Sequence, residues 1–309
     1  MKNNDIVKLK KRLHEISHLS GIAGLVSWDQ EIMMPKKSED ARSEASAYLS
    51  SIIHSKFVSI DKDGLLTRLN KQLKKGELST HDALIVIETD KSFKRESKFS
   101  PEFVFEMAEL SSKAQAVWSR ARKENNFKLF LPYFEKMVAL KIKEAEIVGY
   151  KESPYDALLD TYEPGLVSSE ASTILNDLKD FLVPFVAKIK KSKVKINKKV
   201  TKGHFPLESQ KEFNRTLAEK LGFDFDSGRF DESTHPFTTS FHTTDVRITT
   251  RYSEGDALYA IGSTIHETGH GMYEQGLPSE YFGTPHAEYI SLGIHESQSR
   301  FWEIGRAHV

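Results

Sequence analysis

The chain has 309 residues with 44 basic and 44 acidic side chains, so its formal net charge at pH 7 is zero. This balance provides no overall attraction to nucleic acid or to an anionic membrane, and we expect neither as a partner. The chain contains no cysteine, which excludes disulfides and thiolate ligands and leaves His, Asp and Glu to bind any metal.

The N-terminal segment predicts an amphipathic helix rather than a signal peptide. Ile6, Leu9, Leu13 and Ile16 recur at spacings of three and four residues, which places them on one helical face. Charged residues interrupt the apolar run that a signal peptide needs, and no later run is long enough to span a bilayer. We therefore expect a cytoplasmic protein.

Helical periodicity continues through most of the chain. Similar apolar patterns fill residues 114–148 and 169–189. Pro, Gly and Ser interrupt the period near residues 33–40, 99–103, 151–155 and 162–166. The sequence shows neither an internal repeat nor a low-complexity linker between domains. We expect a mainly α fold in a single helical domain over residues 1–309.

A lysine-rich segment over residues 188–202 contains eight lysines. One interpretation is contact with nucleic acid or an anionic surface, but the segment has no arginine and no interleaved aromatic residue to stack on bases. We expect a solvated helix end and loop instead, because runs of charge usually face water.

The segment of residues 233–253 differs from the rest because it is rich in Thr, Val, Ile, Phe and Tyr. Within it, DVRITTRY (residues 245–252) alternates in the manner of a strand. We predict a short β element here, directly before a helix that carries an H-E-x-x-H motif.

The sequence around this motif predicts the helix itself. Asp256 can cap the helix or lie in its first turn. Leu258, Ile261 and Ile265 give an apolar stripe at helical spacing. Gly-Leu-Pro at residues 276–278 is a strong helix stop.

The motif has the spacing of a metal site with its own base. His266 and His270 lie one turn apart on the same helical face, so both imidazoles can reach one tetrahedral ion such as Zn²⁺. Glu267 lies next to them, where it can reach a metal-bound water as a general base without being a ligand. Alternatively, the histidines are partly buried helix residues bonded to neighbours, but the rarity of the motif favours the metal site.

A catalytic zinc takes three protein groups and leaves one position for water, so a third ligand is required. After a break, the helical pattern restarts at about His286, and a helical hairpin would return Glu296 to the metal. Glu288, His286 and His295 are rival ligands. Because His295 and Glu296 point to different sides of a helix, we expect only one of them to bind. Two histidines and one glutamate are the ligands of hydrolytic zinc peptidases.

The sequence closely resembles the Taq-type (thermostable carboxypeptidase 1) family of zinc metallocarboxypeptidases. The resemblance covers residues 1 to about 303 and includes six stretches: SWDQEIMMP, SPYDALLDTYEPG, GFDFDSGRFDESTHPFTT, DVRITTRY, STIHETGHGMYEQGLP and GTPHAEYISLGIHESQSRFWE. The family's motifs correspond to His235-Pro236-Phe237, to Asp245, Arg247 and Thr249, to His266–His270, and to His295–Gln298. Together these motifs are highly specific.

The resemblance implies a helical metallopeptidase with a long substrate groove and a small β element beside the motif helix. It implies zinc-dependent release of single C-terminal residues from peptide substrates, with broad specificity and poor action next to proline. It makes Glu296 the third ligand beside His266 and His270, and Glu267 the base that activates zinc-bound water. It also implies a cytosolic homodimer when the protein is full length. Co²⁺ or Mn²⁺ could replace Zn²⁺ on these ligands.

Two further residues are candidates for substrate binding. An exopeptidase must recognise the free α-carboxylate, which favours an arginine fork, and Arg247 on the predicted strand is our candidate. Alternatively, Arg247 pairs with Asp245 or Glu296 and supports the site. His235 can bond to the oxyanion or the substrate backbone, or it can orient the loop around Pro236.

The family pattern does not continue to the end of this chain. Two later motifs of the family, I/V-R-x-x-A-D and G-x-x-Q-D-x-H-W, are absent, and the first supplies an arginine for the substrate carboxylate. The ending EIGRAHV back-translates to a common sequencing-adapter read, so we expect residues 304–309 to be non-native and the domain to be incomplete. We expect the chain, expressed alone, to be poorly soluble or inactive because apolar helix faces would be exposed.

Two other functions are compatible with the sequence. A metalloendopeptidase would use the same metal site without a carboxylate clamp, and it would cleave an amidated peptide at internal bonds. A truncated, non-catalytic zinc-binding helical protein would retain zinc without hydrolysis, whether or not Glu267 is replaced by Ala. The agreement of six separated stretches with one family favours the carboxypeptidase.

Overall fold

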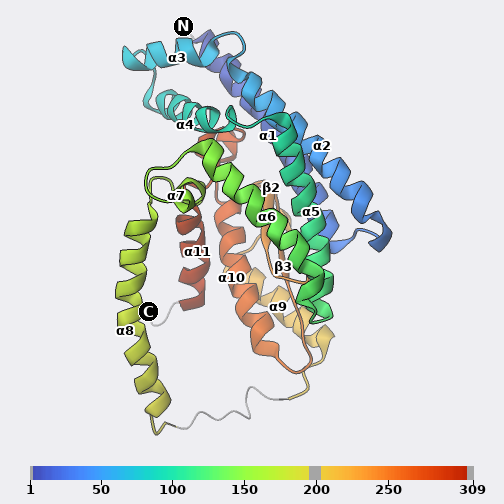
Figure 1. The fold of residues 1–309 in the computed structure, drawn as a ribbon. Helices are drawn as coiled ribbons and strands as arrows, with labels where there is room; N and C mark the ends of the chain where they lie inside the picture. Colours follow the sequence, from blue (N-terminus) through green and yellow to red (C-terminus); the bar gives the residue numbers. More distant parts are fainter. Residues whose placement is uncertain (1–2, 195–202, 305–309) are drawn as a thin grey trace.

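A computed structural model describes residues 3–194 and 203–304, and it is mostly helical with one small sheet (Figure 1). The predicted mainly α fold is confirmed. In the lysine-rich segment, residues 188–194 are exposed as expected, while residues 195–202 lie outside the described part. The expectation that residues 304–309 are non-native also concerns positions outside the described part, apart from Ile304.

The elements follow one another as the sequence pattern indicates. The helices are α1 (Asn4–Ile32), α2 (Glu39–Val58), α3 (Leu65–Lys74), α4 (Thr80–Glu96), α5 (Pro101–Lys123), α6 (Phe127–Val148), α7 (Pro154–Leu159), α8 (Ser168–Lys191), α9 (Leu207–Leu221), α10 (Ala257–Gln275) and α11 (Leu292–Ile304). The strands are β1 (Gly228–Glu232), β2 (Thr238–His242) and β3 (Asp245–Thr250). The four predicted interruptions separate α1 from α2, α4 from α5, α6 from α7 and α7 from α8.

One long predicted pattern, residues 114–148, is divided in the structure. The chain turns between α5 and α6 at Asn125, whose φ of 49° lies in the left-handed region. Asparagine tolerates this conformation better than most residues, so the turn is possible without glycine. The apolar period runs through the turn, which is why the sequence pattern did not show it.

Serine and proline together begin two of the helices. The side chains of Ser100 and Ser153 accept hydrogen bonds from backbone amides in the first turns of α5 and α7. Each serine is followed by proline at the first helical position, where the missing amide would have no helical partner. The residues that end one helical pattern therefore start the next helix.

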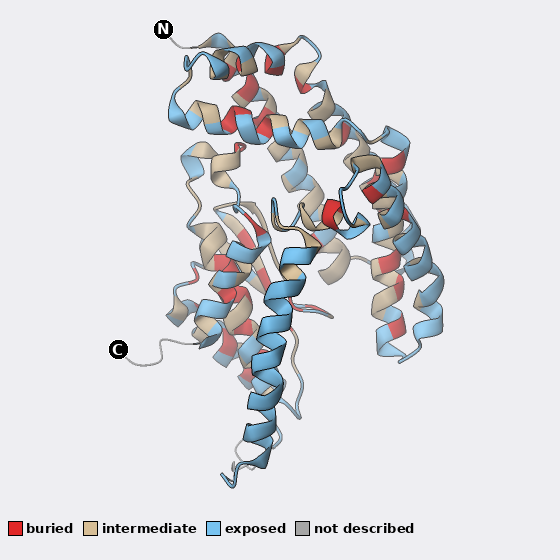
Figure 2. Cartoon of the chain, turned by 60° about the vertical axis from the view of Figure 1, so that its left-hand side comes forward, coloured by how far each residue is buried: buried red, intermediate tan, exposed pale blue. Residues whose placement is uncertain are grey.

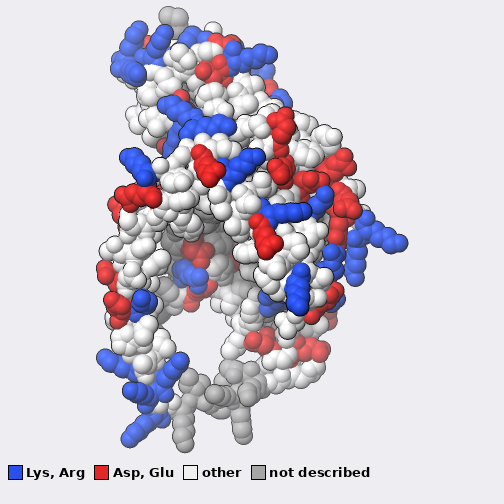
Figure 3. Space-filling model, in the orientation of Figure 1, with Lys and Arg blue, Asp and Glu red and all other residues white. Residues whose placement is uncertain are grey.

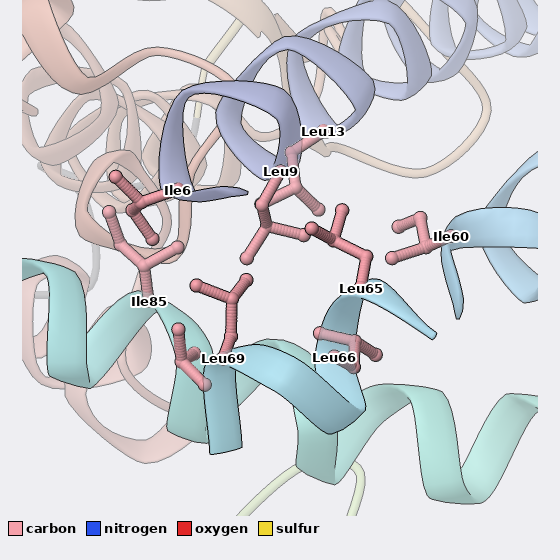
Figure 4. Packing of buried hydrophobic residues seen from close by; sticks show 9 residues of the cluster. Ile6, Leu9, Leu13, Ile60, Leu65, Leu66, Leu69 and Ile85 are labelled. Atoms are coloured by element: carbon pink, nitrogen blue, oxygen red, sulfur yellow. The ribbon is translucent and has the colours of Figure 1, made fainter. Parts of the chain in front are cut away.

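The N-terminal helices pack around their own hydrophobic cluster (Figure 4). Its buried members are Ile6, Leu9, Leu13, Ile60, Leu65, Leu66, Leu69, Ile85 and Val86. The predicted apolar face of α1 supplies the first three, and Ile16 packs at the edge of the cluster. Further along, α1 leaves this cluster and reaches the sheet, where Gly24 lies against the ring of Phe241. The N-terminal cluster and the sheet are thus connected by one long helix.

The sheet has the strand order β1-β3-β2, with β1 parallel and β2 antiparallel to β3. The predicted β element corresponds to β2 and β3, and DVRITT forms the central strand. We did not predict β1, because its sequence GRFDE lacks the apolar alternation of a strand. Its backbone pairs with that of β3, and Arg229 lies opposite Arg247 in this register. A long-range partner, rather than its own sequence pattern, makes this segment a strand.

The two faces of the sheet contact different helices. Val246 and Ile248 of β3 are buried in a second hydrophobic cluster, against which Met272 of α10 packs. On the other face, the guanidinium carbon of Arg247 lies 4.3 Å from the ring centre of Trp28 in α1. Because successive side chains of a strand point to opposite faces, α10 and α1 lie on opposite sides of the sheet.

Helix α8 carries an apolar face that the described part of the chain leaves exposed (Figure 2). The exposed residues on it are Ile174, Leu175, Leu178, Phe181, Leu182, Phe185, Val186 and Ile189. Figure 3 shows a hollow between α8 and the rest of the molecule, with charged side chains on its inner wall. Exposed apolar area of this kind is the physical basis for the expected poor solubility, which stays a prediction. Among the described helices, none is long and apolar enough to cross a membrane.

Candidate metal centre

Helix α10 carries the H-E-x-x-H motif between the predicted start and stop. It begins after Asp256, whose side chain accepts a hydrogen bond from the amide of Tyr259, and it ends before Gly276. The residues that it buries are mostly small or polar: Ala260, Thr264, Glu267, Thr268, Gly269, His270 and Gly271. The expected apolar stripe is therefore not the buried face, and Leu258 is 53% exposed. Small side chains occupy that face because the sheet and α11 approach α10 closely.

Three potential ligand atoms converge beside this helix. Nε2 of His266 lies 3.2 Å from Nε2 of His270. Oε2 of Glu296 lies 3.3 Å from Nε2 of His270 and 3.7 Å from Nε2 of His266. Ligand atoms bound at about 2.0–2.1 Å to one tetrahedral ion lie about 3.3 Å apart. The three atoms therefore fit three corners of a tetrahedron around an ion of the size of Zn²⁺.

The rival candidates for the third ligand contact other groups or lie outside the ligand group. Nε2 of His295 is 2.8 Å from a carboxylate oxygen of Glu274, and Nε2 of His286 is 3.0 Å from the backbone carbonyl of His81. Glu288 is not part of the group of convergent ligand atoms found among the described residues. The ring of His295 stacks on that of His270, with ring centres 4.4 Å apart, but its Nε2 contacts Glu274. Among the described residues, Glu296 is the candidate whose ligand atom converges with those of the two motif histidines.

Glu296 reaches the motif because α11 returns along α10. The α-helix restarts at Leu292 rather than near His286, because the connection first forms two short 3-10 turns. The helices approach closely at Gly269, where an added Cβ would lie 2.7 Å from the Cα of Ser299. The glycine inside the motif therefore permits the helix contact that brings Glu296, the third potential ligand, to the two histidines.

A second carboxylate of α11, which we did not predict, orients one histidine. Nδ1 of His266 lies 2.6 Å from a carboxylate oxygen of Glu303 and donates a hydrogen bond to it. This bond keeps the proton on Nδ1 and leaves the lone pair of Nε2 for a metal. Arg300 pairs with both Glu296 and Glu303, at 3.0 and 2.6 Å. The seven-residue spacing of the two glutamates on one helical face is the sequence signal that could have identified Glu303.

Glu267 is buried next to the ligand atoms and is only 5% exposed. Thr238 of β2, another residue that we did not predict, donates a hydrogen bond of 2.7 Å to the carboxylate of Glu267. Burial raises the pKa of Glu267 to about 7, although the Thr238 bond and the nearby His266 act in the opposite direction. Burial likewise lowers the pKa of His270 to about 4, which keeps this imidazole neutral at pH 7. A histidine must be neutral to bind a metal ion, so this environment suits metal binding.

Arg247 lies on the opposite face of the sheet from Glu267. Its guanidinium donates two hydrogen bonds, of 2.9 and 3.1 Å, to the carboxylate of Asp245. It also stacks over Trp28 of α1, whereas Thr238 contacts Glu267 on the α10 side. This geometry favours the supporting pair with Asp245 among our two alternatives. The substrate-binding role of Arg247 stays a prediction.

His235 is exposed and bonded within its own loop. Its Nδ1 lies 2.6 Å from the carbonyl oxygen of Pro236, and its backbone carbonyl accepts a hydrogen bond from Ser233 over 2.7 Å. Both contacts are those expected of a residue that orients the loop around Pro236. Substrate binding by His235 stays a prediction as well.

Comparison with known proteins decides the family. The model of the carboxypeptidase Taq (M32) metallopeptidase family matches residues 8–308. The chain belongs to this family. Carboxypeptidase 1 of Bacillus subtilis (strain 168) is 38% identical over 297 residues, which cover 95% of this chain and 59% of that protein.

Solved structures share the fold of this chain. The crystal structure of BsuCP gives a TM-score of 0.94 at 35% identity, covering 97% of this chain and 60% of that one. The structure of Pyrococcus furiosus carboxypeptidase gives a TM-score of 0.83 at 35% identity, covering 98% of this chain and 61% of that one. The chain thus spans about 60% of the length of the carboxypeptidases that it matches. The matched part contains both helices that carry the potential metal ligands.

In this member of the M32 family, we expect Gly269→Ala to weaken zinc binding by about tenfold or more. The added methyl group would push α11 and its Glu296 away from α10, because it would overlap the backbone at Ser299. Equilibrium competition with a chelator measures the zinc affinity of the variant.

Gly262→Ala is a matched control on the same helix, since an added Cβ there meets nothing within 4 Å. Alanine should stabilise the helix at that position without changing zinc affinity. Equal zinc affinities for the two variants would contradict this account of Gly269.

Proposed function

We propose that this chain is the metal-binding part of a zinc-dependent metallocarboxypeptidase, which releases single residues from the C-termini of peptides. The observation that carries the proposal is the tetrahedral spacing of ligand atoms from His266, His270 and Glu296, with the buried Glu267 beside them. Three protein ligands and an adjacent carboxylate are what metal-dependent peptide hydrolysis requires. Family membership and the names of the relatives support cleavage at the C-terminus.

The residues of the site have separate tasks in the proposed reaction. When bound, Zn²⁺ supplies Lewis acidity at the scissile carbonyl and lowers the pKa of water, and Co²⁺ or Mn²⁺ could replace it. Glu267 accepts a proton from the attacking water and passes it to the leaving amine. Thr238 holds the carboxyl group of Glu267 in place, and Glu303 keeps the lone pair of His266 directed at the ion.

For Arg247 and His235 we propose supporting roles, and the substrate binding predicted from the sequence stays the alternative for each. The two hydrogen bonds from Arg247 to Asp245 and its stacking on Trp28 support a function in holding the sheet against α1. The contact of His235 with Pro236 supports a function in orienting its own loop.

The wider properties of the protein are part of the same proposal. Broad side-chain specificity, poor cleavage next to proline, a cytoplasmic location and a homodimeric full-length protein are what the family resemblance implies. A metalloendopeptidase is the competing enzyme, because Arg247, the carboxylate clamp predicted from the sequence, pairs with Asp245.

Paired peptides test the proposal. One peptide has a free C-terminal carboxylate and the other is amidated, and the products are identified by mass spectrometry. A carboxypeptidase releases single residues from the free acid and leaves the amide intact. Internal cleavage of both peptides would overturn the proposal in favour of an endopeptidase. Bound zinc without any cleavage that depends on Glu267 would favour the non-catalytic zinc-binding protein.

A further inference from the structure

We propose a second metal site on α1, formed by His14 and His18, which binds Cu²⁺ or Ni²⁺. The two histidines lie one turn apart on the helix, and their Nε2 atoms are 3.0 Å from each other. Both side chains are exposed, so an ion in solution can reach them. The same i, i+4 helical spacing brings the imidazoles of His266 and His270 together on α10.

The nitrogen separation indicates which ions fit. Two ligands at right angles, with bonds of about 2.0–2.1 Å, lie about 2.9 Å apart, and at the tetrahedral angle they lie about 3.3 Å apart. The pair on α1 therefore matches adjacent corners of a square-planar or octahedral ion. Square-planar and tetragonal nitrogen sites are typical of Cu²⁺ and Ni²⁺, and Cu²⁺ has the highest affinity among divalent first-row ions.

The proton positions are compatible with an ion. Nδ1 of His14 lies 3.4 Å from the carbonyl oxygen of Phe282, which can only accept, so the proton of His14 is on Nδ1. Its Nε2 lone pair then accepts the Nε2 proton of His18 when no ion is bound. Nδ1 of His18 has no hydrogen-bond partner within the described residues. The His18 proton can therefore move to Nδ1 and free both Nε2 lone pairs for a metal.

The loop after α10 holds the two rings in position. The ring centre of Phe282 lies 5.4 Å from the ring centre of His14 and 5.4 Å from that of His18. The chain can reach α1 here because Gly283, with φ of 81°, has no side chain, and an added Cβ would lie 2.8 Å from the Cα of His14. A pair that is already ordered loses less side-chain entropy on binding than two free histidines.

His242 belongs to the same aromatic cluster but is not a third ligand. Its ring centre lies 4.6 Å from that of Phe282. Its Nδ1 accepts a hydrogen bond from the amide of Thr244 over 3.2 Å, so the neutral ring carries its proton on Nε2. The site therefore offers two protein nitrogens and leaves the other coordination positions to solvent.

Counting bound Cu²⁺ ions in the full chain tests this proposal separately from the proposed peptidase site. Isothermal titration of the metal-free protein should find two strong sites, one on α1 and one at the motif. His18→Ala should remove one ion, His270→Ala the other, and the double variant both. His81→Ala is the matched control, because His81 is an exposed histidine that stacks on Tyr281, and its variant should keep both ions.

The spectrum of the copper identifies the ligands. In the His270→Ala variant, the electron paramagnetic resonance spectrum of the single bound Cu²⁺ should show hyperfine coupling to two imidazole nitrogens. His14→Ala or His18→Ala in that background should weaken copper binding by about tenfold or more, with an unchanged circular dichroism spectrum. The proposal is overturned if both folded variants bind copper as tightly as their parent, or if the spectrum shows fewer than two nitrogens.

Discussion

In a preparation that hydrolyses peptides, Glu267→Gln should reduce the rate by about 10²–10⁴-fold while the metal content of the protein stays the same. Glutamine has the size of glutamate and can still accept the hydrogen bond from Thr238, so the site should keep its shape. Its amide cannot accept a proton from water, so the proposed general base is lost. The measurement is the rate of release of the C-terminal residue, together with metal analysis of the same samples.

A control separates loss of the base from a general loss of a carboxylate. Glu280 is exposed on the 3-10 turn after α10, outside the ligand group, so Glu280→Gln should leave both hydrolysis and metal content unchanged. Hydrolysis by Glu267→Gln at the rate of an active, unmodified preparation would exclude Glu267 as the base. Loss of zinc from Glu267→Gln would show that the residue binds or shapes the metal site instead.

Removal of the two carboxylates of α11 should lower zinc affinity by different amounts. Glu296→Ala removes a proposed ligand, and we expect zinc affinity to fall by more than about 100-fold. Glu303→Gln removes only the hydrogen bond that orients His266, and we expect a loss of about 10–100-fold. Both affinities can be measured by competition with a chromophoric chelator at one pH and ionic strength.

A third variant on the same helix controls for disturbance of α11. Ser297→Ala lies on the exposed side of α11, next to Glu296 in the sequence, and should retain the original zinc affinity. If Glu303→Gln weakens zinc as much as Glu296→Ala, Glu303 is a ligand rather than an orienting group. If Glu303→Gln binds zinc as tightly as the unmodified chain, the bond to His266 has no role in metal binding.

Much of the local structure of this chain follows from its sequence. The start of α10 at Asp256 and the starts of α5 and α7 depend on contacts between a capping residue and the next few amides. The juxtaposition of His266 and His270 is equally local, because any α-helix places residues four apart on one face. Such features need no knowledge of the rest of the fold.

The position of α1 illustrates the boundary between local and long-range information. Its apolar face was predicted, and Ile6, Leu9 and Leu13 are buried in the N-terminal cluster. The apolar stripe of α10 was predicted by the same reasoning, yet Leu258 is exposed. Periodicity shows that a helix has an apolar face, but the neighbouring elements decide which face is covered.

Only the tertiary structure decided how the candidate site is assembled. Glu296 lies next to the motif because α11 packs against Gly269, and nothing within α11 distinguishes it from rivals such as His295. Thr238 reaches Glu267 through the pairing of β2 with β3, and the same sheet separates Arg247 from that carboxylate. These contacts join segments far apart in the chain, and their geometry depends on helix packing and strand register. The sequence by itself determined the metal-binding motif and its helix, whereas long-range packing selected the residues that complete the site.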